Sequence, residues 1–361
     1  MLKFTIALLL ALPGLPAFGA KPVTAEQLEQ LLVTVHGKTD KQVAHKLSEV
    51  QLTERLSPVR LARCEAEMPG SKARQQLIAL ADAAAFFDLP AAEILATAAP
   101  SLTAQSRMIT LVENYVVKTV HLLPDLSATR VTTSYTDLPL NLVNTGLTIT
   151  RPGHLDLSGD AATLDRFQPL HILSTFSATV LYRDGKEVLD SGGKEWKPDP
   201  YANWMDTSGE FGAILITVVV DAAQGKLAWS HWEQGSAGPL AVFRYSVPEE
   251  KSHYLVTYNV NGNLVLERLS GYHGQITVDP ESGTILRMML ETDLKPDDPI
   301  IHSGMLVEYG PVEIGGKTYT CPVKSVSILQ QRKTLYTILN DVSFERYHLF
   351  RAETRILTED H

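Results

Sequence analysis

The chain has 361 residues, of which 44% are hydrophobic and 20% are charged, as in a globular protein with a full core. Its formal net charge of −9 argues against binding to nucleic acid or to an anionic membrane surface, because both favour basic patches. The length allows two domains, or one large β domain with a smaller appendage.

The first residues have the pattern of a secretory signal peptide. A positively charged side chain near the N-terminus precedes the apolar run from Phe4 to Leu12, which is too short to span a bilayer permanently. Ala17 and Gly19 are the small side chains that a signal peptidase requires, which predicts cleavage before Ala20. We therefore expect residues 1–19 to be removed. The mature protein is expected to be periplasmic or secreted, with no transmembrane segment after cleavage.

The predicted helical region covers residues 20–122. Thr24 and Gln27 form a capping box, and Ser57 followed by Pro58 opens another helix. Apolar residues recur at helical spacing, and the short connections favour antiparallel neighbours, so we expect a small helical array. The expected helices cover 24–37, 40 to about 56, 57–70, 77–84 and 108–122.

After Pro124 the apolar period changes to two, which predicts β-strands over residues 123–361. Asn261-Gly262 is a strong hairpin turn. Closely joined hairpins predict an antiparallel sheet large enough to curl into a half-barrel. Segments 138–170 and 191–206 are expected to be long loops. The expected strands are 128–135, 174–182, 226–233, 241–247, 254–260, 264–269, 275–278, 284–291, 305–309, 312–314, 317–319, 323–329, 335–344 and 347–357.

One apolar segment interrupts the predicted sheet. Thr207 and Glu210 fit a capping box, residues 211–219 carry apolar side chains at helical spacing, and Gly225 stands where a C-terminal cap is wanted. A strand is the competing interpretation, because residues 214–220 are rich in β-branched side chains. We favour a helix, which should be buried across one face of the sheet. The predicted fold class is therefore α+β, an N-terminal helical array followed by a large curled antiparallel sheet with one buried helix.

The candidate ligand-binding residues are Trp229, His231, Trp232 and Glu233. His231 and Glu233 lie two apart in a predicted strand and should point to the same face, between the two tryptophans. They could contribute to a site, but a polar pair beside aromatic packing is the simpler interpretation. The sequence has no HExxH motif and supplies no third ligand, so no metal site is predicted.

The two cysteines, Cys64 and Cys321, are far apart in sequence. In an exported protein a disulfide between them is chemically permissible, and two buried thiols are the alternative. Without a CxxC motif they do not predict a zinc site. The chain also lacks a GxSxG elbow, a phosphate loop and a GxGxxG motif, so neither catalytic residues nor a cofactor are predicted.

Six segments carry a resemblance to known proteins: Leu122–Leu126, Ser208–Gly212, Ala241–Val247, Gly274–Arg287, Val307–Gly316 and Phe344–Arg355. They resemble an uncharacterised family of secreted acidobacterial proteins, a resemblance that supports export and architecture but carries no catalytic residues. More distantly, an exported curled sheet with a buried helix is similar to periplasmic lipoprotein carriers, in which the concave face holds acyl chains.

These observations favour a non-enzymatic binding protein of the cell envelope, in which a half-barrel encloses an apolar ligand or a lipidated partner. The alternative is an envelope scaffold or regulatory interaction protein without a ligand cavity. A third possibility is an enzyme with a site near His231, Glu233 and His273. The expected partners are a lipid, a lipoprotein or another envelope protein, and no nucleic acid.

Overall fold

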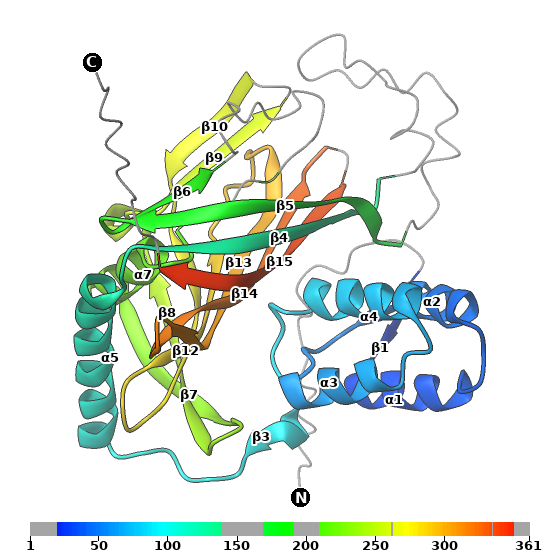
Figure 1. The fold of residues 1–361 in the computed structure, drawn as a ribbon, viewed down its shortest axis with the longest axis horizontal. Helices are drawn as coiled ribbons and strands as arrows, with labels where there is room; N and C mark the ends of the chain where they lie inside the picture. The colour runs from blue at the N-terminus through cyan, green and yellow to red at the C-terminus, as the bar shows by residue number, and fades with distance from the viewer. Residues whose placement is uncertain are drawn as a thin grey trace, which may run out of the picture.

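The computed structural model describes residues 20–138, 169–190, 205, 209–260, 263–333 and 335–349. Within them a helical array precedes a large antiparallel sheet, so the predicted α+β class is confirmed (Figure 1). Five predicted features fall wholly or mostly outside the described residues: the signal peptide, the two long loops, the Asn261-Gly262 turn and the C-terminal strand beyond Leu349.

The helical array begins with four capped helices. The capping box of Thr24 and Gln27 is formed, and the Ser57 hydroxyl caps the helix that starts with Pro58, as predicted. Their apolar faces form one core, which includes Leu28, Leu47 and Leu77. The helices are α1 (Ala25–Thr34), α2 (Asp40–Ser48), α3 (Pro58–Ala66) and α4 (Ser71–Ala83).

The predicted extent of the second helix, to about residue 56, is wrong. The helix ends at Ser48, and β2 (Val50–Leu52) then pairs in parallel with β1 (Lys21–Val23). The backbone N–H of Lys21 donates to the carbonyl oxygen of Glu49 at 3.0 Å, so the strand gains hydrogen bonds that a continued helix would have made internally.

The second region forms an open sheet of 11 strands, in which every neighbouring pair is antiparallel. A separate hairpin of β9 (Leu255–Val260) and β10 (Asn263–Leu269) projects from it (Figure 1). The edges of the sheet, β3 and β6, do not pair with each other, which agrees with the expected half-barrel. In spatial order the strands are β3 (Ile94–Leu95), β7 (Lys226–Gln234), β8 (Pro239–Val247), β11 (Tyr272–Val278), β12 (Ile285–Thr292), β13 (Ile300–Ile314), β14 (Lys317–Gln331), β15 (Thr337–Leu349), β4 (Leu126–Thr136), β5 (His171–Arg183) and β6 (Lys186–Asp190).

Two strands are longer than their sequence pattern predicts. Residues 305–309 and 312–314 belong to the single strand β13, and residues 317–319 and 323–329 belong to β14. A bulge between Glu308 and Tyr309 places Tyr309 opposite Pro322. Because proline has no N–H to donate, the bulge lets the ladder continue past it.

The expected break between strands 335–344 and 347–357 is also wrong within the described part. β15 continues to Leu349, and a bulge between Glu345 and His348 keeps it paired with β4. Arg346 has a φ of 50°, so one left-handed residue produces the irregularity that the sequence suggested was a turn.

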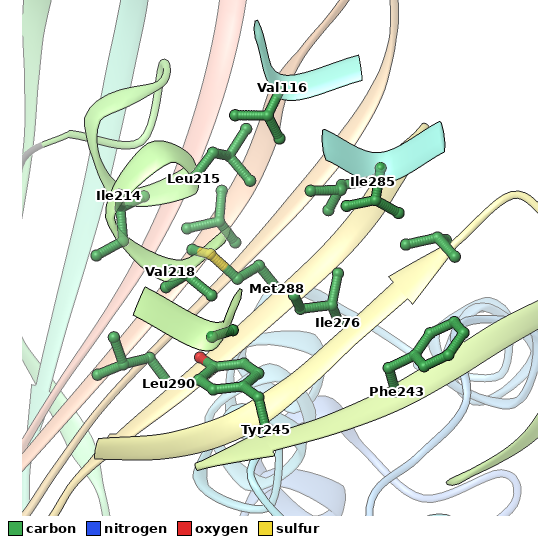
Figure 2. Packing of buried hydrophobic residues seen from close by; sticks show 14 of the residues in the cluster. Val116, Ile214, Leu215, Val218, Phe243, Tyr245, Ile276, Ile285, Met288 and Leu290 are labelled. Carbon is green, nitrogen blue, oxygen red and sulfur yellow. The ribbon is translucent and has the colours of Figure 1, made fainter. Parts of the chain in front are cut away.

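The apolar segment after residue 210 is the helix α7 (Ala213–Gln224), as predicted, and Gly225 is its C-cap. The predicted start is wrong: Gly212 is the N-cap and makes no side-chain cap hydrogen bond, so Glu210 does not belong to a capping box of this helix, and Thr207 lies outside the described residues. Ile214, Leu215 and Val218 are buried against the sheet (Figure 2). Burial of a side chain of this size stabilises a fold by about 1.5–3 kcal/mol, so these contacts hold α7 firmly. The expectation of a buried helix is confirmed.

A second helix, α5 (Leu102–Leu122), covers the same face of the sheet. Its buried residues Met108, Val112 and Val116 belong to the core under α7 and not to the core of the first four helices. The helix α5 therefore packs with the sheet, although its residues lie in the predicted helical region. The division of the chain into units at residue 122 stays a prediction.

Alternate side chains of the central strands face two different cores. On β13, Met305 and Val307 belong to the core under α5 and α7, whereas Leu306 belongs to a cluster with Phe86. Successive side chains of a strand point to opposite faces. One face is therefore covered by α5 and α7, and the other contacts the end of the array (Figure 1). We call them the helix face and the array face.

Candidate functional site

The four residues predicted as ligand contacts lie on β7, where one extra residue separates them into two pairs. Trp229 is opposite Phe243 and His231 is opposite Val242, so Ser230 is the bulged residue. The bulge brings Trp229 and Trp232 to the helix face, although they are three residues apart. Their ring centroids lie 4.8 Å apart, and both rings pack against the core under α5 and α7.

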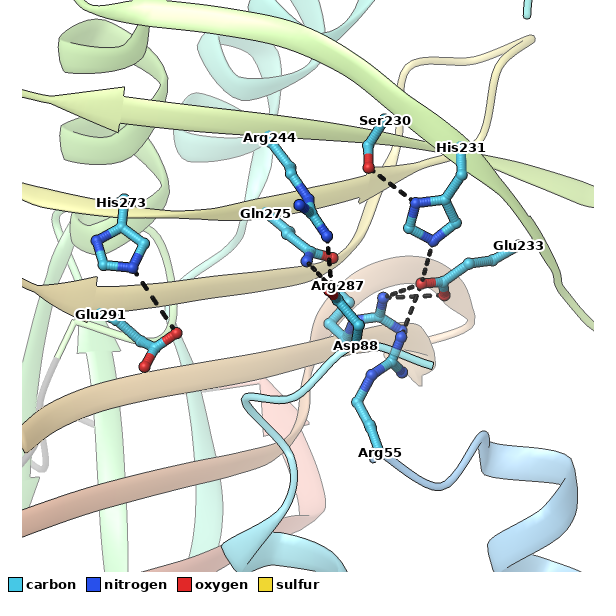
Figure 3. Close-up of polar contacts among 10 residues, drawn as sticks. All are labelled: Arg55, Asp88, Ser230, His231, Glu233, Arg244, His273, Gln275, Arg287 and Glu291. Carbon is cyan, nitrogen blue, oxygen red and sulfur yellow. Dashed lines mark hydrogen bonds and ion pairs between the residues drawn. The ribbon is translucent and has the colours of Figure 1, made fainter. Parts of the chain in front are cut away.

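His231 and Glu233 point together to the array face, as the sequence predicted. His231 Nε2 lies 3.2 Å from Glu233 Oε1, and His231 Nδ1 lies 2.9 Å from the Ser230 hydroxyl oxygen (Figure 3). The pair is therefore a polar pair beside aromatic packing. The tryptophans and the pair do not line one common site.

Glu233 is the centre of a buried ionic cluster. Arg55 Nη2 donates to Glu233 Oε1 at 2.7 Å, and Arg287 Nη2 lies 2.8 and 2.9 Å from the two carboxylate oxygens (Figure 3). The three side chains are 6–9% exposed. Arg55 lies between β2 and α3 and Arg287 on β12, so the cluster joins the helical array to two strands.

The charges of this cluster are fixed at neutral pH. Burial alone would raise the pKa of the Glu233 carboxyl, but the hydrogen bond from His231 and the charges of Arg287 and Arg55 hold it well below its usual range. Burial and the nearby Arg287 lower the pKa of Arg55 to about 10, and Glu233 opposes that change. Glu233 is therefore an ionised, enclosed carboxylate, which suits a structural contact better than a general base.

Two further ionic contacts join the array to the same face. Asp88 accepts from Arg244 at 2.5 Å and from Gln275 at 3.2 Å (Figure 3). Lys324 on β14 donates to the buried carboxylate of Asp82 at 2.7 Å. Burial alone would lower the pKa of Lys324, but Asp82 and a second carboxylate raise it above its ordinary value. Both contacts hold the end of α4 and the following residues against the sheet.

Phe86 supplies the apolar part of the same contact. Its ring lies edge-on to His302, with centroids 5.8 Å apart. A Cβ atom on Gly304 would lie 2.7 Å from the Phe86 ring, so the glycine leaves room for the ring on β13. His302 Nε2 is 3.0 Å from Glu291 Oε2, which continues the polar contacts beyond the ring.

Sequence analysis missed most residues of this interface, including Arg55, Asp82 and Arg287. Arg55 and Glu233 are 178 residues apart, and no local pattern connects them. The nearest signal is the predicted pairing of His231 with Glu233, which identifies the strand but not its partners.

The function favoured by the sequence, enclosure of an apolar ligand by the sheet, depends on the helix face. A pocket between α5, α7 and the strands is lined by side chains such as Val112, Val219, Phe243 and Ile276. Its volume is about 30 Å³. That is about the share of liquid volume of one water molecule, whereas ligand pockets measure about 300–1,000 Å³.

The two cysteines are free thiols in separate clusters, and no disulfide joins them. Cys64 is in the array core, and Cys321 lies among residues of β4, β5, β14 and β15. Burial raises the pKa of the Cys321 thiol to about 12. Among the described residues, no three His, Cys, Asp or Glu side chains are placed to hold a metal ion.

None of the helices in the described part of the chain is long and apolar enough to cross a membrane. Comparison with family models, with curated proteins and with solved structures finds no match to this chain.

Proposed function

We propose that this chain is an exported, non-enzymatic interaction protein of the cell envelope, whose sheet holds the helical array in a fixed position. The observation that carries the proposal is the buried cluster of Arg55, Glu233 and Arg287 between the array and the sheet. Export is supported by the signal-like pattern of residues 1–19.

The array contact has the character of a permanent interface. A buried carboxylate with two arginine partners is strongly destabilised when a partner leaves, because a buried charge then remains unpaired. Phe86 adds apolar contact, and the Asp88 and Lys324 contacts flank it. Such an interface supports a scaffold that presents the array, and does not favour an array that swings away from the sheet.

The helix face supports the same interpretation. The chain's own helices α5 and α7 occupy it and leave a pocket of about 30 Å³. Ile214, Leu215 and Val218 fill the place where an apolar ligand would otherwise lie.

One observation favours a second candidate, a carrier of an apolar ligand or a lipidated partner. The lining of the small pocket is apolar except for Glu113. If α5 moved away from the sheet, the exposed surface would be a continuous apolar trough. The carrier function therefore requires α5 to leave its observed position.

Native mass spectrometry of the mature protein, purified gently from its own envelope, distinguishes the two candidates. The scaffold function predicts the mass of the polypeptide alone, and hydrogen exchange should show protected amides in α5 and α7 to the same degree as in the central strands. A bound mass in the lipid range that organic extraction removes, together with fast exchange in α5, would establish the carrier and overturn the scaffold.

A further inference from the structure

A groove of about 570 Å³ opens on the helical array and is lined by residues of β1, α1, the end of α2 and β2. Its volume is within the range of about 300–1,000 Å³ that is typical of ligand sites. It is much larger than the pocket on the helix face, which measures about 30 Å³. Neither the ionic interface nor the sheet core includes its lining residues.

The floor of the groove is apolar and preformed. Leu31 and Val50 are half-buried and supply the accessible apolar surface of the groove. Val23 and Val35 also line it but are only 5% and 4% exposed, because both belong to the core of the array. An aliphatic side chain could therefore lie on this floor without rearrangement of the array.

The rim of the groove is cationic, although the chain as a whole has a net charge of −9. Lys21, Lys38 and Lys46 line it, and Glu49 is the single carboxylate among its lining residues, so the lining has a net positive charge. Lys46 donates to Glu49 at 2.8 Å, and this hydrogen bond lowers the pKa of Glu49 and keeps it ionised. Within the described residues, Lys21 and Lys38 make no ion pair.

One side of the groove also carries side-chain amides. Gln27 and Gln30 lie three residues apart on α1, so both reach the same side of the helix. Gln27 Oε1 accepts from the Thr24 backbone N–H at 3.0 Å, which leaves its amide N–H groups to donate elsewhere. Amide groups match the C=O and N–H groups of a peptide backbone, whereas a lipid phosphate would need only the lysines.

We propose that this groove binds an extended acidic peptide segment of another envelope protein. Carboxylates of the segment contact Lys21 and Lys38, its backbone contacts Gln27 and Gln30, and an aliphatic side chain lies on Leu31 and Val50. The inference rests on the proposed function, because it names the partner that an envelope interaction protein would bind.

The test uses the full chain and a fluorescein-labelled hexapeptide in which glutamate and leucine alternate. A hexapeptide with lysine in place of glutamate is its control. We expect fluorescence anisotropy to show binding of the acidic peptide only, and weaker binding at high salt. The double variant Lys21→Glu, Lys38→Glu should weaken binding about tenfold or more, because each change replaces attraction by repulsion.

The matched variant Lys41→Glu, Lys72→Glu changes two exposed lysines of the array outside the groove and should bind within about twofold of the wild type. Thermal unfolding checks that both variants fold. Equal affinity of the wild type and the groove variant, or absence of peptide binding, would overturn the proposal. Direct binding of the protein to phosphatidylglycerol vesicles but not to phosphatidylcholine vesicles, with no peptide binding, would identify a lipid site instead. Hydrogen exchange in α5 separates a lipid bound in this groove from the carrier function, because α5 does not line the groove and only the carrier requires α5 to leave the sheet.

Discussion

Replacement of Glu233 by glutamine should destabilise the protein by about 3–5 kcal/mol. The carboxylate is shared by Arg55 and Arg287, with nitrogen–oxygen distances of 2.7–2.9 Å. The glutamine side chain has nearly the same shape but no charge. Two buried guanidinium groups would then face each other without the anion that separates them.

The magnitude follows from the geometry of the cluster. Two unit charges about 4 Å apart attract by about 4 kcal/mol at an effective dielectric constant of about 20. The variant loses two such attractions and keeps the repulsion between Arg55 and Arg287. Hydrogen bonds to the new amide oxygen and local entry of water recover part of the loss, which brings the expected net cost to the stated range.

Urea denaturation followed by tryptophan fluorescence measures this change, since Trp229 and Trp232 lie on the same strand as Glu233. Glu313→Gln is the matched control, because Glu313 is exposed on β13 and should change stability by less than about 0.5 kcal/mol. A Glu233→Gln variant as stable as this control would refute the reasoning. The triple replacement Arg55→Met, Glu233→Leu, Arg287→Met should recover most of the loss, because it leaves no buried charge unpaired.

The remaining predictions concern acidity, the helix face and the thiols. The folded-state pKa of Glu233 is depressed, so its contribution to stability is fully present above the ordinary glutamate pKa of about 4.3. This contribution should be lost as the pH falls below that value. Urea midpoints measured across the acid range test this expectation. Leu215→Ala should cost about 2–5 kcal/mol in the free energy of unfolding, and a loss below about 1 kcal/mol would show that α7 is not part of the core. Gly283 has a φ of +75°, and a Cβ atom there would lie 2.3 Å from the backbone of α5. Gly283→Ala should therefore accelerate hydrogen exchange in α5. Unchanged exchange would contradict this close approach. Cys64 and Cys321 should resist iodoacetamide in the native state and both react after denaturation, and rapid native labelling of either would show that its burial is transient.

Local signals in the sequence identify most elements of this fold. Thr24 and Ser57 are helix caps because their side chains bond to backbone groups within a few residues, so their effect is readable without tertiary context. Alternation in β8 from Phe243 to Val247 likewise reflects one buried and one exposed face, whereas Val242 is buried on the opposite face. The apolar stripe of α7 is the third case, although its β-branched residues left a strand possible.

The predictions from sequence fail where contacts between residues far apart in the chain decide the structure. Residues 50–52 become a strand because β1 lies beside them, about thirty residues earlier in the chain. The stripe of α5 indicates a buried face but not which core buries it. Arg55 meets Glu233 only because α3 and β7 are brought together by the whole fold, and a lone arginine in a loop carries no sign of that contact.

The bulge at Ser230 has a consequence for how β7 tolerates sequence change. It restarts the inward–outward alternation in mid-strand, so that aromatic side chains serve one core and an ionic side chain serves the opposite interface. Substitutions along β7 alter one surface at a time. Loss of Ser230 would remove the bulge and leave both sets on their faces. Loss of a residue away from the bulge would turn the side chains beyond it to the opposite faces, since register is counted in steps of two. Away from Ser230, the length of this nine-residue strand is therefore constrained more tightly than the identity of most of its residues.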